Sequence, residues 1–534
     1  MDPHRETEPR QIQRRSRNAC DACRARKVKC LYEGDGKCQA CIELAVPCTR
    51  NRPRKKRGPP NRYRIVDHLQ NCCQEEIVDL PSTSPTSTST TAITPNSTST
   101  YLAPLSILDQ IAPRETIRRI IDDWFNLIHS VCPIHHRANF LKRLGNGDLD
   151  NDPEFLAVVI SLCCATVSSL PRKAAVDYPD VTVKRCFEVI QYHRLLDNYR
   201  SISLQWCQAK YHLSTSFVAE ESLISFRLLG EVTTGIKYLV SYELPNMSRI
   251  EAELAKRLHC LVLCGLCTWS IYGRPNIGLI SAQDNIQAIK PLDLNDTELD
   301  PTNIDPSNPW HGDTVTYVPG LNYLTHLFYL WHSSQQTSPL SVPHIQQHMA
   351  YIQRALDTLP PELRWRGGLS RPPGSNFGTD VQTANLYITQ LHIRSSLLEQ
   401  MYTLSKSLPT SPALDGRSVA QGLNLHKDEI RKQRAEIVKD LLEILYHMSE
   451  ETLEANGHSL VPKVRDIGSA LLDEMRVGDS QLNSSETDGS GAFSAQEASM
   501  DLRKLLEKLE RLDFRPWDDG YQRRSFITSS ALRL

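Results

Sequence analysis

Apolar residues recur along most of the chain at the spacing of an amphipathic α-helix. In the clearest case five of them stand at offsets 0, 3, 4, 7 and 11 and form one helical face: Ile117, Ile120, Ile121, Trp124 and Ile128. Similar faces begin at residues 345, 387 and 430, whereas alternating strand patterns are scarce between residues 110 and 476. We therefore expect residues 110–476 to form a large all-α domain.

Two other apolar segments predict helices of different kinds. The run from Phe155 to Leu170 is nearly continuous, but it contains Ser, Thr and Cys and is shorter than the roughly 20 residues that a membrane-spanning helix needs. It predicts a buried helix, and we expect no membrane association. Within residues 500–534 a single apolar face predicts an amphipathic helix, followed by an acidic and apolar mixture of the kind that activation segments share.

Polar segments separate these helical regions. Residues 1–17 are polar and rich in Arg, and residues 477–499 are rich in Gly and Ser, so both are expected to be disordered. Residues 65–109 contain a short helical pattern and then an almost unbroken Ser, Thr and Pro run, which indicates a linker. The chain is therefore predicted to hold a small N-terminal unit apart from the large helical one.

Charge is distributed unevenly between these two parts. Residues 1–70 carry 18 Lys or Arg against 8 Asp or Glu, whereas the remaining 464 residues carry 43 against 54. The whole chain has a net charge of −1, which by itself suggests no special partner. A basic N-terminal segment joined to a mildly acidic body indicates a polyanionic partner bound through that segment.

Six cysteines lie in this basic segment, in the order C-x2-C-x6-C-x7-C-x2-C-x6-C: Cys20, Cys23, Cys30, Cys38, Cys41 and Cys48. The half-motif C-x2-C-x6-C occurs twice, which predicts a pseudo-two-fold repeat. Two tetrahedral zinc ions need eight ligand positions, so six thiolates can hold two Zn²⁺ only if two sulfurs bridge both metals. The repeat suggests Cys20 and Cys38, the first cysteine of each half, as the bridges.

Other interpretations of the six cysteines compete with a two-zinc cluster. One is a disulfide framework, which is disfavoured because the chain shows no secretory signal and intracellular thiols stay reduced. Another is a single-zinc knuckle with two spare cysteines. A cross-brace interaction module needs eight ligands and wider spacing. The spacing favours two structural zinc ions per chain.

The two halves of the repeat differ in the side chains that they carry. Arg24, Arg26, Lys27 and Lys29 stand between the second and third cysteines, whereas residues 42–47 are mostly apolar. The first half can therefore approach DNA phosphates and guanine edges, and the second can only pack. Neutralisation of the thiolates by these four basic residues is the alternative role.

With its cysteine spacing and basic runs, the segment resembles the fungal binuclear zinc-cluster family. The resemblance implies a two-helix zinc module over residues 18–50 that binds double-stranded DNA. It further implies that the end of the first helix enters the major groove over a CGG-like triplet, with Lys27 at the main base-reading position and Arg26 beside it. Arg24 and Lys29 are then expected at phosphates or beside the cluster.

A dense basic strip over residues 51–64 follows the module. Its cations can track the DNA backbone, act as a nuclear import signal, or do both, and we expect both: Arg54, Lys55, Lys56 and Arg57. The expected location is the nucleus. The heptad pattern beyond the strip spans barely two repeats between Val66 and Leu80 and has a glutamate in its seam, so a homodimer is expected to be weak or DNA-dependent.

The large body also resembles the middle homology region of the same family, over roughly residues 110–450. Four short strings carry the resemblance: 124–134, 227–232, 272–275 and 359–363. The other ten cysteines show no ligand spacing, and the apolar residues around Cys260, Cys264 and Cys267 predict buried free thiols. The pair His135 and His136 is expected on the surface, because the Asp-Gly that would accompany an acyl-transfer pair is absent.

These observations predict a sequence-specific transcription factor for RNA polymerase II genes, expected to be an activator that recruits transcription coactivators. No catalytic motif stands in the chain, so we expect no enzyme activity. Family resemblance favours a secondary-metabolite biosynthetic gene cluster as the target, with carbon-source utilisation genes as the alternative. A zinc-stapled protein-interaction adaptor is the remaining alternative, and the charge division between the two parts argues against it.

Overall fold

The computed structural model divides the chain into two compact units, Met1–Ser99 and Thr100–Leu534. Each has its own buried cluster of side chains. The structure describes the following residues: 19–26, 30, 36–49, 106–198, 200–218, 222–275, 277–281, 286–300, 315–337, 339–367, 374–407, 416–469 and 490–512. Over these ranges the chain forms helices and no strands, which confirms the mostly α fold class.

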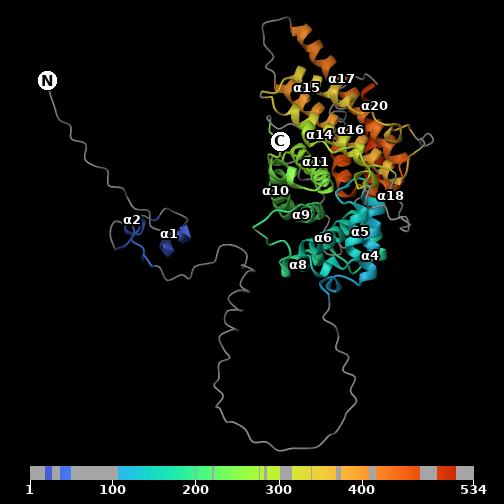
Figure 1. The fold of residues 1–534 in the computed structure, drawn as a ribbon. Helices are drawn as coiled ribbons and strands as arrows, with labels where there is room; N and C mark the ends of the chain where they lie inside the picture. The colour runs from blue at the N-terminus through green and yellow to red at the C-terminus, as the bar shows by residue number, and fades with distance from the viewer. Residues whose placement is uncertain are drawn as a thin grey trace, which may run out of the picture. The chain divides into compact units, whose positions relative to one another are not determined.

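The small unit contains two short helices, α1 (Asp21–Arg26) and α2 (Gln39–Glu43) (Figure 1). Its buried cluster consists of four cysteines, with partly buried Ala22, Ala40 and Val46 packed against them. No large apolar side chain belongs to this cluster in the described part of the unit. Hydrophobic burial alone therefore supplies little stability to the small unit.

The first half of the large unit is built around α6 (Pro153–Ser169), which packs against α4 (Arg114–Asp123), α8 (Val183–Tyr192) and α9 (Leu204–Ser216). Figure 1 shows these helices together at the blue-green end of the unit. The next helix, α10 (Ser222–Tyr238), packs against α9. Shorter elements complete this half: η1 (Ile107–Gln110), η2 (Trp124–Ile128), α5 (Arg137–Gly145), η3 (Asp148–Asp150), α7 (Pro171–Asp177), η4 (Leu239–Glu243) and η5 (Leu244–Asn246).

Helix α6 shows how the local sequence sets an element at the centre of the core. The Asp152 side chain caps its start by accepting from the N–H groups of Glu154 and Phe155, and Pro153 occupies the first turn, where no N–H is needed. Every residue from Phe155 to Ser168 is buried. The buried helix predicted from the apolar run is therefore confirmed, and Pro171 follows where the helix ends.

The second half of the large unit is arranged around the long helix α16 (Phe377–Ser407). It packs against α14 (Val318–Ser334), α15 (Val342–Arg354) and α17 (Gly416–His447). Helix α14 also packs against α11 (Arg249–Ile271), which connects the two halves through α10. The smaller elements are α12 (Ile286–Ile289), α13 (Asp296–Leu299), η7 (Pro361–Leu363), α18 (Glu450–Glu454) and η8 (Gly457–Ser459), and residues 460–469 are also helical.

Helix α11 is long and apolar enough to cross a membrane by length and composition alone. However, 72% of its most apolar window is buried inside the helical body, as in the core helix of a globular unit. The bent pair of α6 and α7 passes the same test of composition, with a 109° break between the two helices. These helices form part of the core of the large unit.

The last helix, α20 (Ser490–Leu512), begins earlier than its apolar face indicated. The segment predicted to be loose, residues 477–499, is helical from residue 490 onward, and residues 477–489 lie outside the described ranges. Ala, Gln and Glu between residues 492 and 498 have high helix propensity, which favours this earlier start. Leu505 is fully buried, and α20 packs against α17 and α18.

Candidate metal centre and nucleic-acid interface

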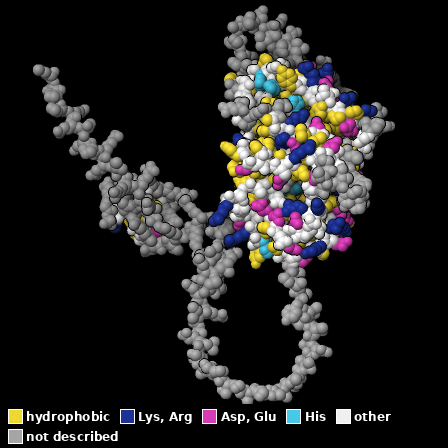
Figure 2. All heavy atoms as spheres, viewed as in Figure 1, with side chains coloured by type: hydrophobic (Ala, Val, Ile, Leu, Met, Phe, Trp, Pro, Cys, Tyr) yellow, Lys and Arg dark blue, Asp and Glu magenta, His cyan; other side chains and the backbone are white. Residues whose placement is uncertain are grey.

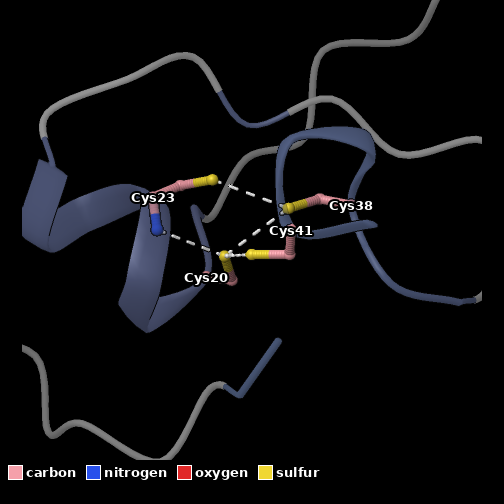
Figure 3. A group of neighbouring side chains, drawn as sticks. All are labelled: Cys20, Cys23, Cys38 and Cys41. Carbon is pink, nitrogen blue, oxygen red and sulfur yellow. Dashed lines mark hydrogen bonds between the residues drawn. The ribbon is translucent and has the colours of Figure 1, made fainter. Parts of the chain in front are cut away.

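Four of the six predicted cysteine ligands meet in the small unit. Cys20 directly precedes α1 and Cys23 lies in its first turn, whereas Cys38 is the N-cap residue of α2 and Cys41 lies within that helix. All four are buried, and their sulfur atoms lie within 4.8 Å of one another (Figure 3). Among the described residues they form the one group of three or more His, Cys, Asp or Glu side chains with this geometry.

Three sulfur pairs link the two helices. The Sγ atoms are 3.6 Å apart for Cys20 and Cys38, 3.5 Å for Cys20 and Cys41, and 3.5 Å for Cys23 and Cys38. These separations are far longer than a disulfide bond of about 2.05 Å. Two sulfurs on one tetrahedral Zn²⁺, each at about 2.3 Å, stand about 3.8 Å apart, so the spacing fits shared zinc ligands.

Cys20 and Cys38 differ from the other two buried cysteines in their contacts. Each takes part in two of the three sulfur pairs between the helices, whereas Cys23 and Cys41 each take part in one. A sulfur that bridges two metals must lie close to ligands from both halves of the repeat. The arrangement of the sulfurs is therefore the one expected for bridges at the first cysteine of each half.

The remaining two cysteines, Cys30 and Cys48, lie at the edge of the group and are partly buried. The backbone N–H of Cys20 donates to Cys30 Sγ at 3.4 Å, and the N–H of Cys38 donates to Cys48 Sγ at 3.5 Å. The two halves thus repeat the same contact, with the first N–H of each half donating to its last sulfur. Such N–H donors stabilise the thiolate form of a sulfur.

The ends of the module are tied together by backbone and side-chain contacts. The N–H of Asp21 donates to the carbonyl of Thr49 at 2.8 Å, and Thr49 Oγ1 donates to Asp21 Oδ2 at 3.0 Å. At the end of α2, Ala45 adopts a left-handed φ of 49°, and the N–H of Val46 turns back to the carbonyl of Cys41. These contacts return the chain to the start of α1.

Electrostatics explain why the group needs a cation. Loss of water raises the pKa of Cys23 to about 11 and raises the pKa values of Cys38 and Cys41. At Cys20 burial acts in the same direction, but hydrogen bonds from the Cys23 N–H and from neighbouring thiols outweigh it and lower the pKa to about 6. Four thiolates this close would repel one another strongly, so their joint ionisation requires positive charge among them. Zinc supplies it and displaces the thiol protons.

The structure describes only part of the predicted DNA-contacting set. Arg26 is exposed at the end of α1, with its Nε donating to the carbonyl of Ala22 at 3.3 Å. Arg24 lies within α1. The other predicted contacts lie outside the described residues: Lys27, Lys29, Arg54, Lys55, Lys56 and Arg57.

The outer surface around α2 has a different character. Ile42 and Leu44 are 62% and 57% exposed, and the neighbouring Glu43 is exposed as well. Within the described part of the small unit these apolar side chains therefore face solvent, although the sequence pattern suggested that they would pack. On the face of the large unit shown in Figure 2, basic and acidic side chains are interspersed.

In the large unit the expectation of a surface position for the histidine pair is wrong. His135 and His136 are buried, with 3% and 4% exposure, because the loop before α5 turns into the core. His136 caps α5 by accepting from the N–H of Asn139, and His135 Nε2 lies 2.7 Å from His212 Nε2. The partner of His135 is 77 residues away in the sequence, so no local pattern signalled this pair.

The cysteines of the large unit behave as expected from their apolar neighbours. Cys260, Cys264 and Cys267 are buried free thiols on α11, which confirms that prediction. Burial raises the pKa of Cys260 and Cys267 to about 12, so these sulfurs stay protonated at neutral pH. They are core side chains rather than reactive or metal-binding ones.

Comparison with family models gives a match within the small unit. Residues 18–58 match the model of the fungal Zn(2)-Cys(6) binuclear cluster domain. The chain is 34% identical over 71 residues to the maltose fermentation regulatory protein of Saccharomyces cerevisiae, a match that covers 13% of this chain and 15% of that protein. It is 39% identical over 61 residues to an ABC-transporter-regulating transcription factor of Aspergillus oryzae, covering 11% of this chain and 6% of that one. No solved structure matches the chain.

Proposed function

Because residues 18–58 form a fungal Zn(2)-Cys(6) binuclear cluster domain, we propose that this chain is a sequence-specific DNA-binding regulator of transcription by RNA polymerase II and is not an enzyme. The observation that carries the proposal is the group of four buried sulfurs that joins α1 to α2. Two structural zinc ions in this domain hold α1 in place. The proposed reader of DNA is the basic half of the repeat, which continues from α1.

The proposed ligands of the two zinc ions are all six cysteines of the repeat, with Cys20 and Cys38 as the bridges. The sulfur contacts shared by these two residues support their role. The matched N–H donors to Cys30 and Cys48 support the terminal ligands. No cysteine of the large unit enters this ligand set.

Metal analysis of the purified chain tests the ligand set. We expect two zinc ions per chain, and Cys30→Ser should reduce that number while Cys267→Ser, a buried thiol on α11, should leave it at two. Retention of both zinc ions by Cys30→Ser would remove this residue from the ligand set. Cys267→Ser is the control, because it removes one cysteine from the same chain without removing a proposed zinc ligand.

For DNA recognition we propose two classes of contact. Lys27, beside the exposed Arg26, reads a base edge of a CGG-like triplet in the major groove. Residues 54–57 bind phosphates and carry no sequence information. Arg24 and Lys29 are assigned to phosphates or to the charge balance of the cluster.

Titration of a CGG-containing duplex and a scrambled duplex at several salt concentrations tests this division. Lys27→Ala should lose discrimination between the two, which is worth about 1 to 3 kcal/mol for one base contact. The double variant Lys55→Ala and Lys56→Ala should weaken both duplexes alike and lower the salt slope by up to about two units. If Lys27→Ala weakens both duplexes equally while its zinc content is intact, Lys27 is a phosphate contact.

The proposed location is the nucleus, since the partner is duplex DNA and residues 51–64 have the composition of an import signal. Transcription coactivators and a weak or DNA-dependent homodimer remain proposals as well. Equilibrium sedimentation of the full chain, with and without a duplex carrying two triplets, tests the homodimer. A tight dimer without DNA would contradict it.

The regulated genes remain a prediction from family resemblance. The two relatives are named for maltose fermentation and for ABC-transporter regulation, so similarity to this chain accompanies different named targets. We propose control of a secondary-metabolite biosynthetic gene cluster, with carbon-source utilisation genes as the alternative. Genome-wide occupancy mapping distinguishes them, because binding would concentrate either at one gene cluster or at scattered metabolic promoters.

A further inference from the structure

A half-open cavity of about 450 Å³ lies in the large unit, where four helices begin. Its wall includes the N-cap residue of each helix: His136 of α5, Asp152 of α6, Ser203 of α9 and Ser248 of α11. The volume falls within the roughly 300 to 1,000 Å³ typical of small-molecule sites. It lies far along the chain from the zinc-binding cysteines and plays no part in the function proposed above.

The charges around the cavity argue against an anionic ligand. Helix N-termini attract anions, but the protein's own carboxylates already occupy those of α6 and α11, while side chains of His136 and Ser203 cap α5 and α9. Asp152 accepts from two N–H groups of α6 and pairs with Arg143 at 2.6 Å. Glu251 accepts from the N–H of Ser248 at 3.2 Å and from its hydroxyl at 2.7 Å. A second anion would find no unpaired cation among the described residues that line the cavity.

The buried histidine pair supplies a neutral hydrogen-bond donor. Burial, together with the neighbouring histidines, lowers the pKa of His135 well below 6.5, and burial lowers that of His212 to about 3, so both rings are neutral at pH 7. Their Nε2 atoms are 2.7 Å apart, so one of the two must donate. The buried Nδ1 of His212 has no partner among the described residues and would be an orphaned donor if it carried the proton.

The tautomers follow from that network. His212 carries its proton on Nε2 and donates it to His135, whose own proton then lies on Nδ1. His135 is 97% buried and lines the cavity, and its Nδ1 has no partner among the described residues. The His135 ring therefore offers an N–H donor to a ligand with a carbonyl oxygen.

Gln208 adds an acceptor to the same wall. Its Nε2 donates to the carbonyl of Ile134 at 2.5 Å, which fixes the orientation of the amide. The side chain is 4% exposed and lines the cavity, and its Oε1 has no partner among the described residues. A free amide oxygen in this position accepts from a ligand O–H or N–H.

The rest of the wall is aromatic and aliphatic. The rings of Phe140 and Phe155 meet edge to face at 5.3 Å, and both line the cavity together with Leu204 and Leu254. The Arg143 guanidinium covers the outer ring, 4.0 Å from the centroid of Phe155. Such a wall binds a flat apolar body, with the polar groups fixing its orientation.

We infer that this cavity binds an uncharged, mainly apolar small molecule carrying a carbonyl oxygen for His135 and a hydroxyl or N–H group for Gln208. The two buried side chains with free polar atoms and the paired charges around them define this chemistry. The ligand class is therefore neutral aromatic or alicyclic hydroxy-carbonyl compounds. Binding would occupy the point where α5, α6, α9 and α11 meet.

Titration of the full-length protein with a small fragment, monitored by ligand-observed NMR, tests the ligand chemistry. The probe is 4-hydroxybenzamide, which is neutral and carries both polar groups on one ring. At ten non-hydrogen atoms its dissociation constant is expected at about the millimolar level. The isosteric anion 4-hydroxybenzoate should bind about tenfold more weakly or not at all.

Cavity-filling variants test the location. Gln205 is a half-buried residue of the α9 wall, and Gln205→Trp should abolish binding of the probe. Leu223→Trp adds the same side chain at a position of α10 that is 78% exposed, and should leave binding unchanged. Ile250→Trp fills the cavity from α11 and replaces the first variant if that one unfolds.

Each outcome decides the inference. Binding of 4-hydroxybenzamide that is lost in a folded cavity-filling variant and kept in Leu223→Trp supports it. Equal or tighter binding of 4-hydroxybenzoate would make the cavity an anion site and overturn the inferred chemistry. No binding of the neutral probe at tenfold above the expected dissociation constant, or binding that survives Gln205→Trp and Ile250→Trp, would show a solvent-filled cavity only.

Discussion

At the scale of single residues, Lys463 is a buried lysine in the core of the large unit. It is 2% exposed, and its Nζ donates to Asn385 Oδ1 at 3.2 Å and to Thr389 Oγ1 at 2.7 Å. The ring of Phe328 lies 5.8 Å away, and no carboxylate is among its partners in the described residues. Burial without a counter-charge lowers the pKa of Lys463 to about 8.

This buried ammonium predicts a pH-dependent stability. The folded state holds the Lys463 proton only up to about pH 8, whereas the unfolded chain holds it up to its ordinary pKa of 10.5. Between these pH values the unfolded state therefore binds more protons, so the contribution of Lys463 to the free energy of unfolding rises with pH. Relative to Lys463→Met, the wild-type free energy of unfolding should rise by about 1 kcal/mol between pH 7 and pH 9.

Denaturant unfolding at a series of pH values measures this difference, with Lys184→Met as the control. Lys184 is 82% exposed, so its replacement should give a curve parallel to that of the wild type. Subtraction removes the opposite pH dependence of the buried thiols, which both proteins share. Parallel curves for Lys463→Met and the wild type would show that Lys463 keeps its ordinary pKa in the fold.

Single residues also show where sequence reasoning reaches its limit. The cysteine spacing predicted the zinc module, because ligands of a small site stand close together in the chain. Lys463 and His135 gave no such signal, since their partners lie 74 to 78 residues away. The expectation of a surface position for His135 failed for this reason. Polarity alone does not reveal burial when the satisfying groups come from distant helices.

At the scale of elements, the crossing of α9 and α10 is closer than ordinary side chains allow. A Cβ atom on Gly235 of α10 would lie 2.8 Å from Cys207 Sγ and 2.9 Å from the ring of Trp206. Glycine at this position therefore allows the two helices to approach. Gly230, one and a half turns earlier in α10, has only an ordinary contact, with Ile277 Cδ1 at 3.6 Å.

The two glycines predict opposite effects of the same substitution. Gly230→Ala should stabilise the large unit by about 0.5 to 1 kcal/mol, because alanine favours the helix over the unfolded chain. Gly235→Ala gains the same preference of alanine for the helix, but its new methyl group crowds Cys207 and Trp206. The substitution should therefore lower the free energy of unfolding by about 1 to 3 kcal/mol overall. Thermal unfolding of both variants provides the test. Equal stabilisation by the two substitutions would mean that α9 and α10 separate at little cost.

Several helices of the body could be predicted from apolar spacing, but their limits and their neighbours could not. The face from Ile117 to Ile128 is buried as expected, although its second part, residues 124–128, is a π-helix rather than an α-helix. Periodicity reports which side of a helix is apolar and says little about hydrogen-bond register. It also gives no information on the close contact at Gly235, which depends on a second helix.

At the scale of the whole molecule, the two units rest on different sources of stability. The small unit buries cysteines and few apolar atoms, whereas the large unit has one extensive apolar core. The uneven charge and the Ser, Thr and Pro run already indicated this division in the sequence. What the sequence did not contain is the cavity at the starts of α5, α6, α9 and α11, because four distant segments build it.

Removal of zinc should therefore unfold the small unit and leave the large unit folded. We expect a chelator to abolish DNA binding and unfold the small unit, because metal binding supplies most of its folding free energy, of order 10 kcal/mol in small zinc modules. The large unit should keep its thermal unfolding transition. Far-UV circular dichroism should change little, since α1 and α2 contain only 6 and 5 residues.

Tryptophan fluorescence makes this experiment selective. All seven tryptophans lie between residues 124 and 517, in the unit Thr100–Leu534, so their emission reports that unit alone. The unfolding midpoint measured by fluorescence should be the same with and without chelator, while binding of a CGG-containing duplex is lost and returns when zinc is restored. A midpoint that falls on chelation would show that the large unit depends on the metal. In that case the zinc module would act as part of one cooperative fold, and the Cys30→Ser variant should lower the same midpoint.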